Sequence, residues 1–187
     1  MKVLILINKV GLGDCILHIN YIHEISKKYG KPVSILAKEN TRAKDLFLDD
    51  PYVNDVITLD RLNDNTGYHD GISGFFKLAK DIKEKKFDKV FIFNSSIRYF
   101  LVCKTAGIKK IAQYPLFKKK GQHVVNTAKI FTENELNKIV STQPKLLISE
   151  EKILKAKKDI SLNHKNIVLG VSASGPTKRW GIKNFIE

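Results

Sequence analysis

Two segments that lie far apart in the chain carry residue types that could do chemistry. Near the start, Val10-Gly11-Leu12-Gly13-Asp14 places a carboxylate directly after a glycine turn. Near the end, residues 172–178 combine hydroxyl-bearing side chains, a glycine and a lysine in a short turn. A carboxylate can accept the proton of a reacting hydroxyl, whereas hydroxyls, backbone N–H groups and an ammonium group bind phosphate. The sequence therefore predicts a candidate base and a candidate phosphate site.

The phosphate site is predicted from the order of its residues. A buried strand leads into the turn, where Ser172 and Ser174 offer hydroxyls and Lys178 supplies a positive charge. Gly175 lets backbone N–H groups approach an anion closely. The alternative is an ordinary solvated turn.

The crevice loop Gly11, Leu12 and Gly13 follows the first apolar run, and ligands bind beyond the carboxyl ends of strands in open α/β folds. A third glycine is missing at the spacing of the dinucleotide fingerprint, and a carboxylate at a helix start would repel a pyrophosphate. Asp14 is therefore either the N-cap of the following helix or a functional carboxylate at the mouth of the crevice.

The elements that must position these segments alternate between strand and helix. The strand patterns are continuously apolar without period-two alternation, which is typical of a parallel sheet covered on both faces. The loop 63–70 is the one obvious flexible insertion. Strands are predicted at 2–7, 33–37, 55–59, 88–94 and 109–112, and helices from about 14 to the Gly30 turn and at about 41–48, 72–85, 96–106, 123–140 and 150–159.

The chain of 187 residues is long enough for one complete domain and the beginning of another. We expect a Rossmann-like domain at 1–160, a linker at 161–165 and the start of a second domain at 166–187. Its 43% hydrophobic and 28% charged residues are typical of a globular protein. No apolar run is long enough to span a bilayer or to act as a signal peptide, so a cytoplasmic location is expected.

The formal net charge of +14 suggests an anionic partner, such as an acidic membrane or a phosphorylated glycan. Lysines are dispersed through almost every helix and arginines are few, which argues against a nucleic-acid partner. Dispersed lysines on solvated faces are the alternative explanation. Cys15 and Cys103 are expected to be buried thiols. His18 and His23 are expected on solvated helix faces.

Three segments resemble the family-nine glycosyltransferases, which are the lipopolysaccharide heptosyltransferases. Residues 2–14 look like the opening strand and Gly-Leu-Gly-Asp turn of that family. Residues 172–180 are similar to the segment that opens its second domain, although Gly181 stands where the family usually has proline. Residues 94–110 resemble its middle region, where an arginine-bearing helix ends in Ala-Gly.

The resemblance implies a GT-B fold, in which two Rossmann-like domains face each other across a cleft. It implies inverting transfer of heptose, or a related sugar, from an ADP-sugar donor to a lipid-linked glycan acceptor, the inner core of lipopolysaccharide. Asp14 matches the general base, whereas Lys178 and Ser174, with Ser172 nearby, match the donor-phosphate pocket. No cofactor and no metal are expected.

Further expectations follow from how much of a family member the resemblance covers. The second domain would be truncated and the fragment inactive alone. Peripheral contact with an anionic inner membrane is expected from the net charge. His123 stands where the family often has a histidine, but a helix cap explains it equally well. The competing hypotheses are a non-catalytic nucleotide- or glycan-binding Rossmann-like module and a basic protein that associates with membranes or nucleic acid.

Overall fold

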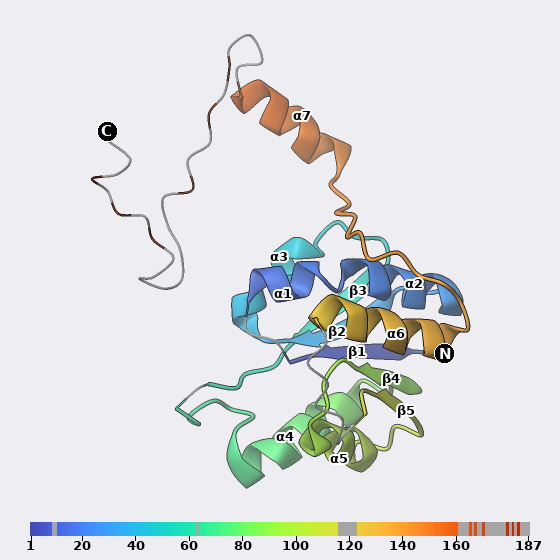
Figure 1. Ribbon diagram of the computed structural model, residues 1–187. Helices are drawn as coiled ribbons and strands as arrows, with labels where there is room; N and C mark the ends of the chain where they lie inside the picture. Colours follow the sequence, from blue (N-terminus) through green and yellow to red (C-terminus); the bar gives the residue numbers. More distant parts are fainter. Residues whose placement is uncertain are drawn as a thin grey trace. The chain divides into compact units, whose positions relative to one another are not determined.

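A five-stranded parallel sheet forms the centre of the N-terminal part of the chain in the computed structural model (Figure 1). The structure describes residues 1–8, 11–62, 64–115 and 123–160, together with Lys165, Ile167, Gly170, Arg179, Gly181 and Lys183. The strands are β1 (Val3–Ile7), β2 (Val33–Ala37), β3 (Val53–Thr58), β4 (Lys89–Ile92) and β5 (Lys110–Gln113). The helices are α1 (Leu12–Ile16), α2 (Ile19–Tyr29), η1 (Glu39–Thr41), α3 (Ala43–Leu46), α4 (Gly71–Glu84), α5 (Ile97–Thr105), α6 (Val124–Leu136) and α7 (Glu150–Asp159).

The strand order is β3-β2-β1-β4-β5, and all neighbouring pairs are parallel. The chain builds outward from β1 through β2 to β3, then crosses back to place β4 on the other side of β1. Strand order therefore reverses between β1 and β4. In open α/β sheets, the carboxyl ends of the two strands at such a reversal flank the ligand-binding crevice.

Strand β1 is fully buried because helices cover both faces of the sheet. Val3, Ile5 and Ile7 join one hydrophobic cluster with α1, α2 and α6, while Leu4 and Leu6 join a second cluster with α4 and α5. Each such fully buried aliphatic side chain contributes about 1.5–3 kcal/mol relative to an exposed one. The continuous apolar pattern is the sequence signature of this two-sided burial.

The single helix predicted from about Asp14 to the Gly30 turn is in fact two helices. Helix α1 ends after Ile16, and α2 begins after His18. The His18 amide donates to the carbonyl of Cys15, three residues back, instead of that of Asp14. The His18 side chain occupies the Asp14 carbonyl instead, with Nδ1 and the oxygen 2.6 Å apart. A side-chain hydrogen bond thus replaces a helical one and separates the two helices.

Helix α6 is shorter than the sequence predicts. It ends at Leu136 because Asn137 adopts a left-handed conformation, with φ of 49°, that terminates the helix. At its other end His123 is the N-cap, and its ring accepts a hydrogen bond from the Val125 amide at 3.3 Å. The capping alternative for His123 is therefore confirmed.

The chain divides into two units, Met1–Leu147 and Ile148–Glu187. The first contains the sheet and its covering helices. The described part of the second is chiefly α7, all of whose residues are exposed. Acidic residues in its first turn and lysines in its last turn complement the helix dipole. Among the described residues, no helix combines the length and the apolarity needed to cross a membrane.

Gly74 lies where α4 meets the backbone of the preceding loop. A Cβ added at this position would lie 2.1 Å from the carbonyl carbon of His69, which leaves no room for a side chain. Replacing a helical glycine with alanine ordinarily stabilises a protein by about 1 kcal/mol. At Gly74 the added methyl group would clash with the backbone of His69, so the same replacement is expected to destabilise the protein.

We therefore expect Gly74→Ala to lower the free energy of unfolding by about 1–3 kcal/mol, as overpacking does. The matched control is Gly13→Ala in α1, where an added Cβ meets no atom within 4 Å. This control should be neutral or stabilising. Urea denaturation followed by circular dichroism measures both changes, and equal stabilities for the two variants would contradict the close contact.

Candidate functional site

The crevice loop lies at the carboxyl end of β1, beside the reversal of strand order. Gly11 is the N-cap of α1 and has extended backbone angles, φ of −136° and ψ of 162°. Leu12 and Gly13 form the first exposed positions of the helix, and Asp14 follows them. The predicted strand, glycine turn and helix are thus present. They bring the Asp14 segment to the edge of the sheet where ligands bind in this class of fold.

Asp14 is the third residue of α1 and not its N-cap, so the predicted capping role is wrong. Its side chain is half-buried and turns back toward the start of the helix. A methyl group at Gly11 would lie 3.6 Å from an Asp14 carboxyl oxygen. The carboxylate therefore lies over a glycine, where no side chain from Gly11 obstructs it.

His18 anchors the backbone of Asp14. The imidazole is fully buried, and Nδ1 lies 2.6 Å from the Asp14 carbonyl oxygen. Because a carbonyl oxygen only accepts hydrogen bonds, Nδ1 carries the proton and donates it. The ring packs edge-on against Phe93 with centroids 5.1 Å apart. The prediction that His18 lies on a solvated face is wrong; the spacing of four residues from Asp14 was the available signal.

His23 is also buried, contrary to prediction. Its Nε2 lies 2.6 Å from Oδ2 of Asp50, and its ring lies beside that of Tyr52. The pair is set between α2 and the turn that precedes β3. The pair therefore ties α2 to the turn that precedes β3.

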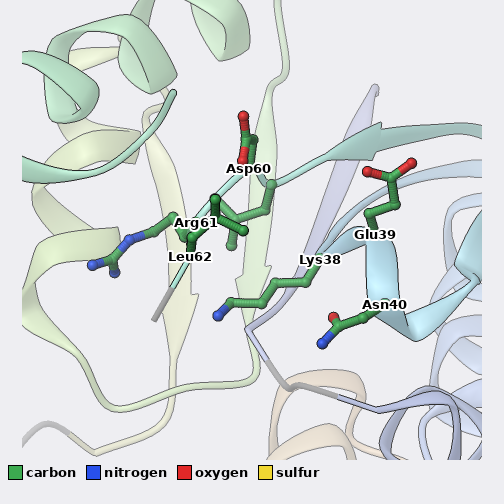
Figure 2. Close-up of a pocket in the computed structure, with 7 residues that line it drawn as sticks. Lys38, Glu39, Asn40, Asp60, Arg61 and Leu62 are labelled. Atoms are coloured by element: carbon green, nitrogen blue, oxygen red, sulfur yellow. The ribbon is translucent and has the colours of Figure 1, made fainter. Parts of the chain in front are cut away.

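A cleft of about 500 Å³ opens at the carboxyl ends of β2 and β3. Helix α1, which carries Asp14, contacts η1, and η1 contributes to the cleft wall. In Figure 2 the Lys38 side chain extends toward the segment of Arg61 and Leu62, while Glu39 points away from that segment. The full lining is Lys38, Glu39, Asn40, Leu59, Asp60, Arg61 and Leu62.

The lining contains both hydrogen-bond donors and hydrogen-bond acceptors, and both positively and negatively charged side chains. Such a surface suits a ligand that carries many hydroxyl groups, because each hydroxyl both donates and accepts. The sequence reasoning missed this cleft. Its residues lie at the ends of two strands, and only the parallel register of β2 and β3 brings them together.

Asp70 holds the cleft wall in place. Its carboxylate accepts hydrogen bonds from the backbone amides of Leu62 at 2.9 Å and Gly67 at 3.0 Å, and from Arg61 Nε at 2.8 Å. Burial alone would raise the pKa of Asp70, but these hydrogen bonds together hold that pKa below its usual value. Arg61 Nη1 also lies 3.4 Å from the Tyr99 hydroxyl, which links the wall to α5.

His69 fixes the other side of the same loop. Its Nδ1 accepts a hydrogen bond from the Asp60 amide at 3.0 Å, so the proton of the neutral ring resides on Nε2, which lies 3.0 Å from Asp81 in α4. Over the described residues 64–70, the loop predicted at 63–70 is held by side-chain hydrogen bonds. Polar residues that look solvated in the sequence bind the loop backbone instead.

The two cysteines are buried, as predicted. Burial raises the pKa of Cys15 to about 12, with a further contribution from the nearby Asp14 charge, and burial raises that of Cys103 to about 12 as well. Both thiols therefore stay protonated near neutral pH and are poor nucleophiles. Within the described ranges, no cluster of His, Cys, Asp or Glu could hold a metal ion.

The predicted phosphate site cannot be placed beside Asp14. Ser172, Ser174 and Lys178 all lie outside the described residues. Most residues of the predicted second domain also lie outside the described part of the chain. The linker at 161–165 therefore stays a prediction. The described site thus consists of the crevice loop with Asp14 and the cleft at the carboxyl ends of β2 and β3.

Comparison with known proteins relates this arrangement to solved structures. No protein-family model matches the sequence, and no curated protein matches it significantly. A glycosyl transferase family 9 structure from Veillonella parvula superposes with a TM-score of 0.66 and 18% identity, covering 98% of this chain and 57% of that one. The chain shares its fold with family 9 glycosyltransferases.

A second solved structure extends this likeness. Escherichia coli ADP-heptose LPS heptosyltransferase II superposes with a TM-score of 0.57 and 18% identity, covering 85% of this chain and 50% of that one. The chain therefore spans about half the length of the two structures. The expected α/β fold class, a Rossmann-like parallel sheet of the GT-B type, is confirmed.

The Asp70 hydrogen bonds predict a pH dependence of stability. The pKa of this carboxyl is lower in the folded protein than its ordinary value. The stabilising contribution of the carboxylate is therefore present above about pH 4 and is lost as the pH falls through the folded pKa. We expect Asp70→Asn to cost about 1–3 kcal/mol at neutral pH and to flatten the loss of stability in acid.

Urea denaturation at neutral and acidic pH measures this effect. Asp55→Asn is the matched control, because Asp55 pairs with Lys85 at 2.8 Å on an exposed surface. Its cost should stay within about 1 kcal/mol. An Asp70→Asn variant that loses stability in acid as steeply as the wild type would contradict the assignment.

Proposed function

We propose that the chain forms the acceptor side of an inverting glycosyltransferase. In this proposal the enzyme transfers heptose, or a related sugar, from an ADP-sugar to a lipid-linked glycan such as the inner core of lipopolysaccharide. The observation that carries it is the position of Asp14: a half-buried carboxylate next to the reversal of strand order. The fold shared with family 9 glycosyltransferases supports the same conclusion.

The proposed reaction requires one proton acceptor on this side of the cleft. The hydroxyl oxygen of the acceptor glycan attacks the anomeric carbon of the donor, and the bond from that carbon to the diphosphate oxygen breaks. The hydroxyl proton passes to the Asp14 carboxylate and later to water. Attack from the face opposite the leaving group inverts the anomeric configuration. A carboxylate within hydrogen-bond reach of the hydroxyl contributes about 10²–10⁴-fold to such a step.

The arrangement around Asp14 suits a base that must not move. Helix α1 is short, and the His18 side chain fixes the carbonyl of Asp14 within it. Gly11 and Gly13 carry no side chains, which leaves space for an acceptor to approach. Preorganisation of this kind reduces the entropic cost of aligning a hydroxyl with the base.

The cleft beside η1 is the proposed place for the acceptor glycan. Lys38, Asn40 and Asp60 offer donors and acceptors to sugar hydroxyls, and α1 adjoins the same wall. On the donor side, we assign Lys178, Ser174 and Ser172 to the diphosphate. Their hydroxyl and ammonium groups would stabilise the charge that builds on the leaving group.

The test is transfer from ADP-heptose to heptose-deficient lipopolysaccharide by the natural gene product that contains this chain, with ADP release and product mass as readouts. We expect Asp14→Asn to lower kcat by about 10²–10⁴-fold with little change in stability, because asparagine keeps the shape of the side chain.

Asp45→Asn serves as the matched control, because Asp45 is also in the first turn of a short helix and is exposed. It should leave kcat unchanged. Full activity of Asp14→Asn would remove the proposed base. Saturable binding of ADP-heptose without any transfer would instead favour a non-catalytic binding module.

A further inference from the structure

The outer faces of α4 and α5 carry large apolar side chains that nothing in the described chain covers. On α4, Ile72 is 80% exposed and Phe76 is 60% exposed; on α5, Ile97 is 56% exposed and Leu101 is 43% exposed. Exposed single apolar residues are common, but a cluster of large ones on adjacent elements marks an interaction surface. We call these four residues, together with Tyr68, the outer apolar patch.

Helical spacing places each pair of patch residues on one side of its helix. Ile72 and Phe76 are four residues apart, as are Ile97 and Leu101, so each pair lies on one side of its helix. The opposite sides of the two helices are buried against the sheet through residues such as Leu78 and Val102. Figure 1 shows α4 and α5 together on one face of the sheet, away from α1, α2 and α6.

Arg98 holds the two halves of the patch together. Its Nη2 donates to the carbonyls of His69 at 2.9 Å and Gly71 at 2.8 Å, which lie at the start of α4. Its guanidinium also lies 5.6 Å from the centre of the Phe75 ring. Because Ile97 precedes Arg98 and Ile72 follows Gly71, the two exposed isoleucines lie at the same end of the helix pair.

Lysines border this apolar surface. Lys77 lies over the Tyr68 ring, with Nζ 4.3 Å from its centre, while Lys80 and Lys104 are exposed one turn beyond Phe76 and Leu101. Lysine stems cover apolar surface while their ammonium groups stay in water, and tyrosine favours the boundary between apolar and aqueous phases. An apolar face flanked by lysines is typical of amphipathic helices that lie in the interface of a membrane.

We propose that the outer apolar patch docks the protein on the surface of an anionic lipid bilayer. The apolar side chains would insert among the lipid headgroups, and the bordering lysines would contact anionic headgroups. Charge complementarity selects this occupant, because α4 and α5 together carry more basic residues (Lys77, Lys80, Lys83, Arg98 and Lys104) than acidic ones (Asp81 and Glu84). The overall charge of +14 acts in the same direction. This proposal does not depend on the proposed glycosyl transfer.

The experiment is co-sedimentation of the full chain with phosphatidylglycerol-containing vesicles and with pure phosphatidylcholine vesicles. We expect binding to the anionic vesicles that weakens at high salt. The double variant Phe76→Ser, Ile97→Ser should reduce the partition coefficient at least about tenfold. The matched control is Ile130→Ser, Ile139→Ser, which changes two exposed isoleucines at α6 and just beyond it. This control should bind as the wild type does.

A charge series tests the lysine border separately. Replacing Lys77, Lys80 and Lys104 with glutamine should reduce binding by about fivefold per lysine. Replacing Lys28, Lys31 and Lys44 with glutamine removes the same charge from the other layer of the protein and should have a much smaller effect. Circular dichroism melts confirm that each variant is folded before binding is compared.

The opposite outcomes overturn the proposal. If the wild type does not bind anionic vesicles, or if the patch and control variants lose binding equally, the patch is not a membrane surface. If light scattering shows a dimer that only the patch variant dissociates, with no vesicle binding, the surface joins two copies of the chain. Neither outcome bears on Asp14, whose test is a turnover measurement.

Discussion

The pairing of β1 with both β2 and β4 is the constraint on which the rest of the structure depends. Because β1 is central, its alternate side chains enter two separate hydrophobic clusters, and the same strand packs against both layers of helices. The same pairing places the reversal of strand order at the end of β1, where the crevice loop begins. The stability of the fold and the location of Asp14 thus have a common origin.

The succession of strands and most helices along the chain could be predicted from the sequence, because those elements are encoded locally. A run such as Lys2 to Ile7 is apolar on both faces, and α7 is bounded by a serine before it and by charges that suit its dipole. The break between α1 and α2 could not be predicted in this way. A helical pattern does not reveal that the side chain of His18 would bind the Asp14 carbonyl, which in a continuous helix accepts the His18 amide.

The cleft and its supporting loop escaped prediction for a related reason. Asp60, His69 and Asp70 look like solvated loop residues, yet they are bound to backbone amides several residues away or to α4. The local sequence shows that these side chains are polar. Whether they face solvent or form hydrogen bonds within the protein depends on which groups the fold brings near them. Asp14 was identified from a short motif, but its place within α1 required the geometry of Gly11.

The connection between β3 and α4 has a consequence for how the chain can change in length. Surface connections usually accept extra residues at a small entropic cost. Here the amides of Asp60, Leu62, Gly67 and Tyr68 each have a side-chain acceptor at a fixed position in the chain, and Gly74 closes the space behind them. An inserted residue would put these donors out of step with their acceptors, so this stretch should tolerate point changes at its exposed tip far better than insertions.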